Sequence, residues 1–477
     1  MAVKKVAAES KQGVVRAQER RDRGMVDHES LGLLLQAARK LNAGFAGLPE
    51  FESSAPGLER FAEVLAATAE RLQDNYPYFH PLYAGQMLKP PHPIARLAYA
   101  LAMWINPNNH ALDGGRATSA MEKEAVAEIA GMFGWKDFLG HLCGGGTMAN
   151  LEALWVAGQL HPGKKILASE QAHYTHGRIS GVLQLQFESV ATNALGRMDM
   201  TALAKRLERG DVGTVVGTMG TTATGSLDPL PEILALRAKH GFRVHADAAY
   251  GGYFVLTKNL GAEARAAFEQ IGQVDSIVID PHKHGLQPYG CGCVLFRDPG
   301  VGQLYKHDSP YTYFSSRDLH LGEISLECSR PGAAAAALWA TQRLLPLTRG
   351  GKFADGLEKG RKAALMLFEK LKADSRFVTA FAPELDILVF APRGPCVSES
   401  SARSRKIFEA AAKRDLHLAV AELPIHFWEK KLGGMKRDRE TLTCLRSVLM
   451  KPEHLEWVDR IWELLSEAAT EALAART

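Results

Sequence analysis

The stretch VDSIVIDPHKHG, residues 274–285, places Lys283 between two histidines, directly after a run of apolar residues. DSIVID has the length and the β-branched composition of a buried strand. Lysine rarely follows such a strand, because removing an ammonium group from water is costly unless another group pairs with it or uses it. The position of Lys283 therefore predicts a chemical role rather than that of a solvated surface lysine.

The same kind of short β-rich run recurs on both sides of this stretch. Four further runs read as buried strands: KKILAS (164–169), VGTVVGTM (212–219), FRVHADA (242–248) and GCVLFR (292–297). Helical stretches separate several of them, including LPEILALRAKHG (230–241) with a C-terminal glycine. Alternating strands and helices predict an α/β domain with a mainly parallel sheet covered on both faces. GCVLFR follows DSIVID too closely for a crossover helix, so we expect it to run antiparallel.

We expect three parts in the 477-residue chain. Residues 1–95 form an N-terminal helical arm with an aromatic, proline-rich patch, residues 96–345 form the large α/β domain, and residues 346–477 form a small α+β domain. In the last part LDILVFAPR is expected to be a strand and RGPCVSESSAR (393–403) an exposed loop.

Composition narrows the class of protein. The net charge of +4 gives no argument for binding nucleic acid or a membrane, and no run of 18 apolar residues predicts a transmembrane helix. Six scattered cysteines without a CxxC pair indicate a reduced, cytoplasmic protein. The sequence contains no HExxH or CxxC pattern, so we do not expect a metal site.

Unusual residues gather where the predicted strands end, which is where ligands bind in open α/β sheets. Asp247 ends FRVHADA, Lys283 follows DSIVID, and KKILASEQAHYTHG leads to His173. In HLCGGGTMANLEAL, Gly145, Gly146 and Thr147 open a helix, where exposed backbone N–H groups suit a phosphate, although a tight helix entry is the simpler explanation. The turn is neither GxGxxG nor GxxxxGK[ST], so the sequence lacks the fingerprints of sites for nicotinamide dinucleotides and nucleoside triphosphates.

Pyridoxal 5'-phosphate needs this combination of groups. Its aldehyde forms a Schiff base with a lysine, for which Lys283 is the candidate. A carboxylate, here Asp247, keeps the pyridine nitrogen protonated so that the ring can accept carbanion electrons. A flat side chain such as His173 covers the ring, and the glycine turn holds the phosphate.

Taken together, these motifs resemble the group II pyridoxal-phosphate-dependent amino-acid decarboxylases of the aspartate-aminotransferase fold type I. The resemblance is densest over residues 75–332, and KPPHPIA and SPYTYF resemble the tyrosine and aspartate decarboxylase branch. It implies a seven-stranded-type sheet and a homodimer. It also implies that Thr222 lies near the cofactor, Ala249 lies beneath the ring, and His282 lies at the phosphate. Asp280 either forms a turn or contacts the phosphate side.

The resemblance further implies α-decarboxylation of an L-amino acid to the amine and CO2. The substrate would be tyrosine-like if aromatic residues, with Tyr83 and His92, form its mouth. It would be acidic if Arg116 binds a carboxylate rather than serving as a structural cation. In many family members a tyrosine on a mobile loop donates a proton to Cα. Tyr311 matches a structural position at the start of this loop, and we expect it beside the substrate. Tyr313 and His320 are therefore the candidate proton donors. The alternatives are a carbon–carbon lyase resembling the sphingosine-phosphate lyases and a catalytically silent family member.

Overall fold

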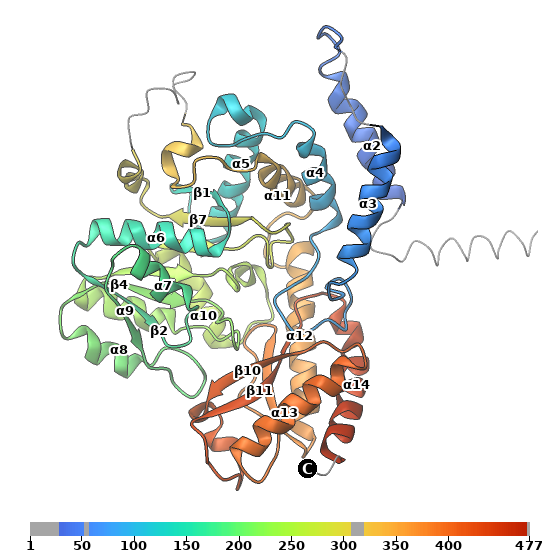
Figure 1. Ribbon diagram of the computed structural model, residues 1–477. Helices are drawn as coiled ribbons and strands as arrows, with labels where there is room; N and C mark the ends of the chain where they lie inside the picture. Colours follow the sequence, from blue (N-terminus) through green and yellow to red (C-terminus); the bar gives the residue numbers. More distant parts are fainter. Residues whose placement is uncertain (1–27, 52–56, 307–318, 475–477) are drawn as a thin grey trace, which may run out of the picture.

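The computed structural model describes residues 28–51, 57–306 and 319–474. Figure 1 shows a large sheet with helices on both faces, a smaller sheet with helices beside it, and an N-terminal helical segment that projects from the body. The strands of the large sheet are β1 Leu139–Cys143, β2 Lys165–Ser169, β3 Phe187–Val190, β4 Val212–Thr218, β5 Arg243–Asp247, β6 Ser276–Ile279 and β7 Gly292–Phe296. The helices of this part are α4 Pro93–Met103, α5 Leu112–Met132, α6 Gly146–Leu160, α7 Thr175–Val182, α8 Met200–Leu207, α9 Leu230–His240, α10 Ala262–Gln270 and α11 Gly332–Leu344.

The large sheet has the strand order β1-β7-β6-β5-β4-β2-β3. β7 is antiparallel to both of its neighbours, β1 and β6, whereas the pairs from β6 to β3 are parallel. The predicted fold class and the antiparallel GCVLFR strand are therefore confirmed. The five strands predicted for this sheet all form, and β1 and β3 are additional.

Side-chain alternation along the strands explains why the sheet is covered on both faces. In β6, Ile277 packs into one apolar cluster with α8, α9 and α10, while its neighbour Val278 packs into another with α6. Val215 and Val216 of β4 divide between two faces in the same way. Strands that are apolar at successive positions can satisfy both faces only when helices cover both.

The second sheet is antiparallel, with the strand order β10-β11-β9-β8. Its strands are β8 Phe377–Thr379, β9 Ile387–Pro392, β10 Ala419–Pro424 and β11 Thr441–Val448, and its helices are α12 Lys352–Ala373, α13 Val397–Ala412 and α14 His454–Ala474. Residues 397–403 thus begin a helix, and the exposed loop predicted for 393–403 is wrong there. The serines of this segment suggested a loop. In the structure the hydroxyls of Ser400 and Ser401 donate to the backbone oxygens of Pro392 and Val397, so both serines are accommodated in the helix.

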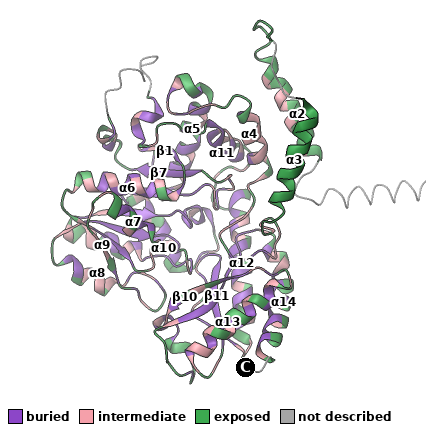
Figure 2. Cartoon of the chain, viewed as in Figure 1, coloured by how far each residue is buried: buried purple, intermediate pink, exposed green. Residues whose placement is uncertain are grey.

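The N-terminal helices α2 His28–Ala43 and α3 Leu58–Leu72 bury no residue (Figure 2). Residue 95, where we placed the first boundary, falls inside α4, and residue 345 lies between α11 and α12. None of the described helices is long and apolar enough to cross a membrane.

Candidate functional site

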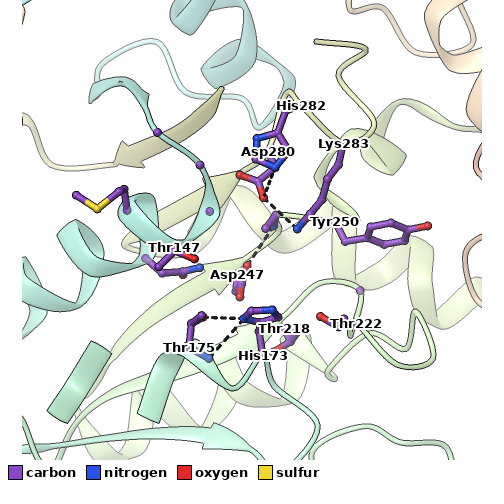
Figure 3. A pocket seen from close by; sticks show the side chains of 17 residues that line it. Thr147, His173, Thr175, Thr218, Thr222, Asp247, Tyr250, Asp280, His282 and Lys283 are labelled. Atoms are coloured by element: carbon purple, nitrogen blue, oxygen red, sulfur yellow. Dashed lines mark hydrogen bonds and ion pairs between the residues drawn. The ribbon is translucent and has the colours of Figure 1, made fainter. Parts of the chain in front are cut away.

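A pocket of about 260 Å³ opens at the carboxyl ends of β4, β5 and β6 (Figure 3). Strand register explains its position, because Thr218 pairs with Asp247 and Asp247 pairs with Val278, so the three strands end at the same level. All ten residues predicted to contact the cofactor line this pocket: Gly145, Gly146, Thr147, His173, Thr222, Asp247, Ala249, Asp280, His282 and Lys283.

The glycine turn joins β1 to α6 and forms one wall. Gly145 has a φ of 139°, a conformation that L side chains rarely adopt. A Cβ atom on Gly146 would lie 2.6 Å from Oδ2 of Asp280, so the turn approaches the floor of the pocket too closely for any side chain. The first turn of α6 therefore presents its backbone to the pocket, at the positive end of a 15-residue helix.

Asp247 is held by His176, a residue that the sequence motifs did not single out. Oδ2 of Asp247 lies 2.8 Å from Nε2 of His176, and the backbone N–H of Ala249 donates to Oδ1 at 3.2 Å. Burial alone would raise the pKa of Asp247, but the His176 hydrogen bond and the nearby His176, His245 and Lys283 lower it well below its usual value. Asp247 is thus a buried carboxylate that stays ionised.

Lys283 faces the same pocket from the turn after β6. Its Nζ lies 3.0 Å from Oδ2 of Asp280, a carboxylate that is only 2% exposed. Nε2 of His282 lies 3.6 Å from the same oxygen, and burial lowers the pKa of His282. Asp280 therefore faces the pocket as the counter-ion of Lys283, rather than serving only to form a turn.

His173 lies on the opposite side of the pocket from Lys283 in Figure 3. Its Nδ1 is 2.8 Å from the hydroxyl of Thr175, which fixes the ring orientation, and burial lowers its pKa. A neutral, flat ring is therefore held at the pocket wall.

The structure does not bring four predicted residues to this pocket. Tyr83 is buried against Tyr78 and His417, His92 caps α4 by accepting from the N–H of Ile94, and Arg116 is exposed on α5. The fourth, His320, is 1% exposed, and its Nδ1 accepts from the N–H of Leu112. Tyr311 and Tyr313 lie outside the described residues.

Arg446, like His176, was not predicted from the sequence. Arg446 is 4% exposed in the middle of β11, and its Nη2 donates to the backbone oxygen of Thr222 at 2.7 Å. Another donor, Nη1, reaches the backbone oxygen of Gly85 at 3.1 Å. Arg446 therefore ties the rim of the pocket to the small sheet. A cation within the apolar run LTCLRSVL is the same signal that singled out Lys283.

Comparison with known proteins identifies the family. Residues 152–393, just over half of the chain, match the pyridoxal-dependent decarboxylase conserved domain. The chain is 29% identical over 315 residues to a probable L-tyrosine/L-aspartate decarboxylase of Methanothermobacter thermautotrophicus, covering 64% of this chain and 82% of the relative. It is also 29% identical over 395 residues to an L-tyrosine decarboxylase of Enterococcus faecium, covering 61% and 64%.

Solved structures agree with the fold. The Oryza sativa TDC structure with PLP and tryptamine gives a TM-score of 0.73 at 18% identity, over 94% of this chain and 99% of the other. Mouse CSAD in its apo form gives 0.72 at 20% identity, over 91% and 98%. The chain therefore belongs to the pyridoxal-dependent decarboxylase family and is a carboxy-lyase that uses pyridoxal 5'-phosphate.

Proposed function

We propose that this protein removes the α-carboxylate of an L-amino acid, in the pocket at the ends of β4, β5 and β6, with Lys283 as the lysine that binds the cofactor covalently. One observation carries the proposal: an ionised, buried Asp247 and the amine of Lys283 line one pocket whose wall is a glycine turn. The pocket thus has an anionic group, an amine and a phosphate cradle, the three groups that this cofactor requires.

The buried polar atoms of the pocket support the fit. Nδ1 of His282 and Oδ1 of Asp280 have no hydrogen-bond partner among the described residues. Buried polar atoms without partners are rare and need an explanation. A polar ligand that fills the pocket supplies one.

Each residue then has a defined task. Gly145, Gly146, Thr147 and His282 would hold the phosphate. Ala249 and His173 would flank the ring, and Thr222 would lie at its edge. Asp247 would hold a proton on the pyridine nitrogen.

When bound, the cofactor supplies an electron-accepting ring that stabilises the charge left on Cα as CO2 departs. Asp247 favours this charge dispersal because it remains ionised, and His176 keeps it so. Asp280 holds Lys283 in place and is available to exchange a proton with its amine at 3.0 Å. With His320 buried away from the pocket, Tyr313 is our proposed donor of the proton to Cα.

We propose a tyrosine-like substrate, with aspartate or glutamate second. The acidic alternative depended on Arg116, which the structure leaves exposed and away from the pocket. An aromatic residue lies beside a residue of the pocket wall: Tyr289 is 58% exposed and packs on His282 with ring centroids 4.8 Å apart. The Enterococcus faecium relative, named as an L-tyrosine decarboxylase, points the same way, whereas the name of the Methanothermobacter relative includes both tyrosine and aspartate.

We also propose a cytoplasmic homodimer. The helices α2 and α3 expose many large apolar side chains that a second subunit would cover: Leu31, Leu33, Leu35, Leu58, Phe61, Val64, Leu65 and Leu72. All six cysteines are free thiols, as expected in a reducing compartment. Light scattering should give twice the subunit mass of 52.0 kDa.

The test of the activity is an assay of the purified holoenzyme with each of the twenty amino acids, measuring CO2 and amine together. We expect equimolar CO2 and amine, with tyrosine the best substrate, and none from Lys283→Ala. The absence of CO2 from every amino acid would contradict the proposal. CO2 from aspartate alone would overturn the substrate assignment and leave the reaction type in place.

A further inference from the structure

A second cavity of about 260 Å³ lies between residues 79–93, the turn after Lys283, the start of α12 and the residues before α14, and it shares no lining residue with the first pocket. Its ionisable lining residues are three lysines, two histidines and one carboxylate: Lys89, Lys352, Lys451, His92, His284 and Glu453. His284 directly follows Lys283, so the two cavities lie on either side of the same turn.

The lysines of this cavity form no direct ion pair. The lysines that pair with a carboxylate in the part of the chain that the structure describes all lie elsewhere: Lys165, Lys283, Lys359, Lys370 and Lys372. Lys451 is only 3% exposed, and its Nζ donates to the backbone oxygen of Tyr83 at 2.6 Å. Burial lowers the pKa of Lys451 to about 7 and that of Lys89 to about 8. Nζ of Lys89 donates to the backbone oxygen of Met450 at 3.4 Å, so backbone oxygens are the hydrogen-bond partners of both amines. A bound anion would offset the cost of charging these amines in a desolvated site.

The backbone adds further positive potential. His92 and Pro93 at the start of α4, Lys352 and Phe353 at the start of α12, and Pro452 and Glu453 just before α14 all line the cavity. The positive ends of three helices of 11, 22 and 21 residues therefore meet there. In Figure 1, α12 and α14 run side by side.

An unpartnered side chain is also present. His284 is 1% exposed and lines the cavity, and its Nδ1 has no hydrogen-bond partner among the described residues. Its Nε2 lies 3.3 Å from Oδ2 of Asp386. Buried polar atoms without partners are rare, and a polar ligand in the cavity would account for this one.

We propose that this cavity is a second site, which binds a small multivalent oxyanion of the phosphate type. Lys89 and Lys451 would pair with the anion inside the cavity, and the exposed Lys352 would close over it from the mouth. Glu453, the one carboxylate of the lining, is exposed and would stay in solvent. The site is additional to the cofactor's own phosphate site at the glycine turn, and it does not depend on which amino acid is the substrate.

The experiment is an isothermal titration of the holoenzyme with inorganic phosphate in a chloride buffer of constant ionic strength. Bound cofactor fills the first pocket, so phosphate cannot register there. We expect one phosphate per subunit, bound about tenfold or more weakly by Lys451→Gln and by Lys352→Gln, because each removes a charge-assisted contact. Lys352 is exposed, so its replacement leaves the core intact. A parallel titration with glycerol 3-phosphate distinguishes a phosphate ester from free phosphate as the ligand.

Lys362→Gln is the matched control. Lys362 is exposed on the same helix, α12, and does not line the cavity. Its replacement should leave phosphate binding unchanged. No saturable binding to the holoenzyme would overturn the proposal. So would equal weakening by all three variants, which would indicate a general charge effect, or unchanged binding by both Lys352→Gln and Lys451→Gln.

Discussion

The pair formed by His176 and Asp247 is the clearest place to test how the protein prepares its pocket. Their side chains meet at 2.8 Å in a site where His176 is fully buried. A hydrogen bond to a buried charged group contributes about 1.5–3 kcal/mol. Replacing His176 with leucine should therefore raise the pKa of Asp247 by about one to two units. The same loss should weaken cofactor binding by about 10- to 150-fold, if Asp247 meets the pyridinium.

The assay is a double-mutant cycle on the cofactor dissociation constant, with His176→Leu, Asp247→Asn and the double variant. In the Asp247→Asn background the loss of His176 should have little further effect, because the charge that it stabilised is gone. His176→Gln retains a donor and should recover part of the affinity.

Strictly additive effects of the two single replacements would refute this reasoning. An unchanged cofactor affinity in His176→Leu would do so as well, provided that the variants melt at similar temperatures. Either result would mean that His176 supports the fold near Asp247 without setting its charge.

Three further predictions follow from single contacts. Gly146→Ala places a methyl group 2.6 Å from Oδ2 of Asp280 and should weaken cofactor binding about tenfold or more. Gly181→Ala is the control, because its methyl group would have no atom within 4 Å, and it should leave binding unchanged. Fluorescence titration with the cofactor measures both dissociation constants. Burial raises the pKa of Asp386 to about 6, so the native state holds this proton more tightly than the unfolded chain does. As the pH rises from 4 to 6, the free energy of unfolding of the wild type should therefore fall by about 2 kcal/mol relative to that of Asp386→Asn. If the melting temperatures of the two proteins changed in parallel over this range, the prediction would be wrong. Lys283→Ala should abolish CO2 release while the protein still binds the cofactor non-covalently, as dialysis would show.

Local sequence patterns predicted most of the strands of the large sheet. β2, β4, β5, β6 and β7 are short apolar runs with turn residues at their ends, and all of them form. β1 was missed because LGHLC contains a glycine and a buried histidine, which pairs with Glu152 at 3.0 Å. That pairing makes a polar residue acceptable inside the sheet, and the local sequence does not reveal it.

The pocket was predicted for a similar reason, since its residues follow strand ends and the strand order brings these ends together. His176 and Arg446 were missed because their roles depend on partners far away in the chain. His176 contacts a carboxylate 71 residues away, and Arg446 contacts Thr222 at a separation of 224 residues. The substrate residues were the weakest prediction, because the aromatic residues near Tyr83 pack against one another and His417 instead of facing the pocket.

The central claim is that Lys283 holds the cofactor in the pocket that Asp247 shares. Reduction of the holoenzyme with borohydride, followed by proteolysis and mass spectrometry, would locate the attached cofactor directly. We predict the phosphopyridoxyl group on the peptide that contains Lys283. Its recovery on another lysine, such as Lys89 or Lys451, or on no lysine at all, would contradict the account.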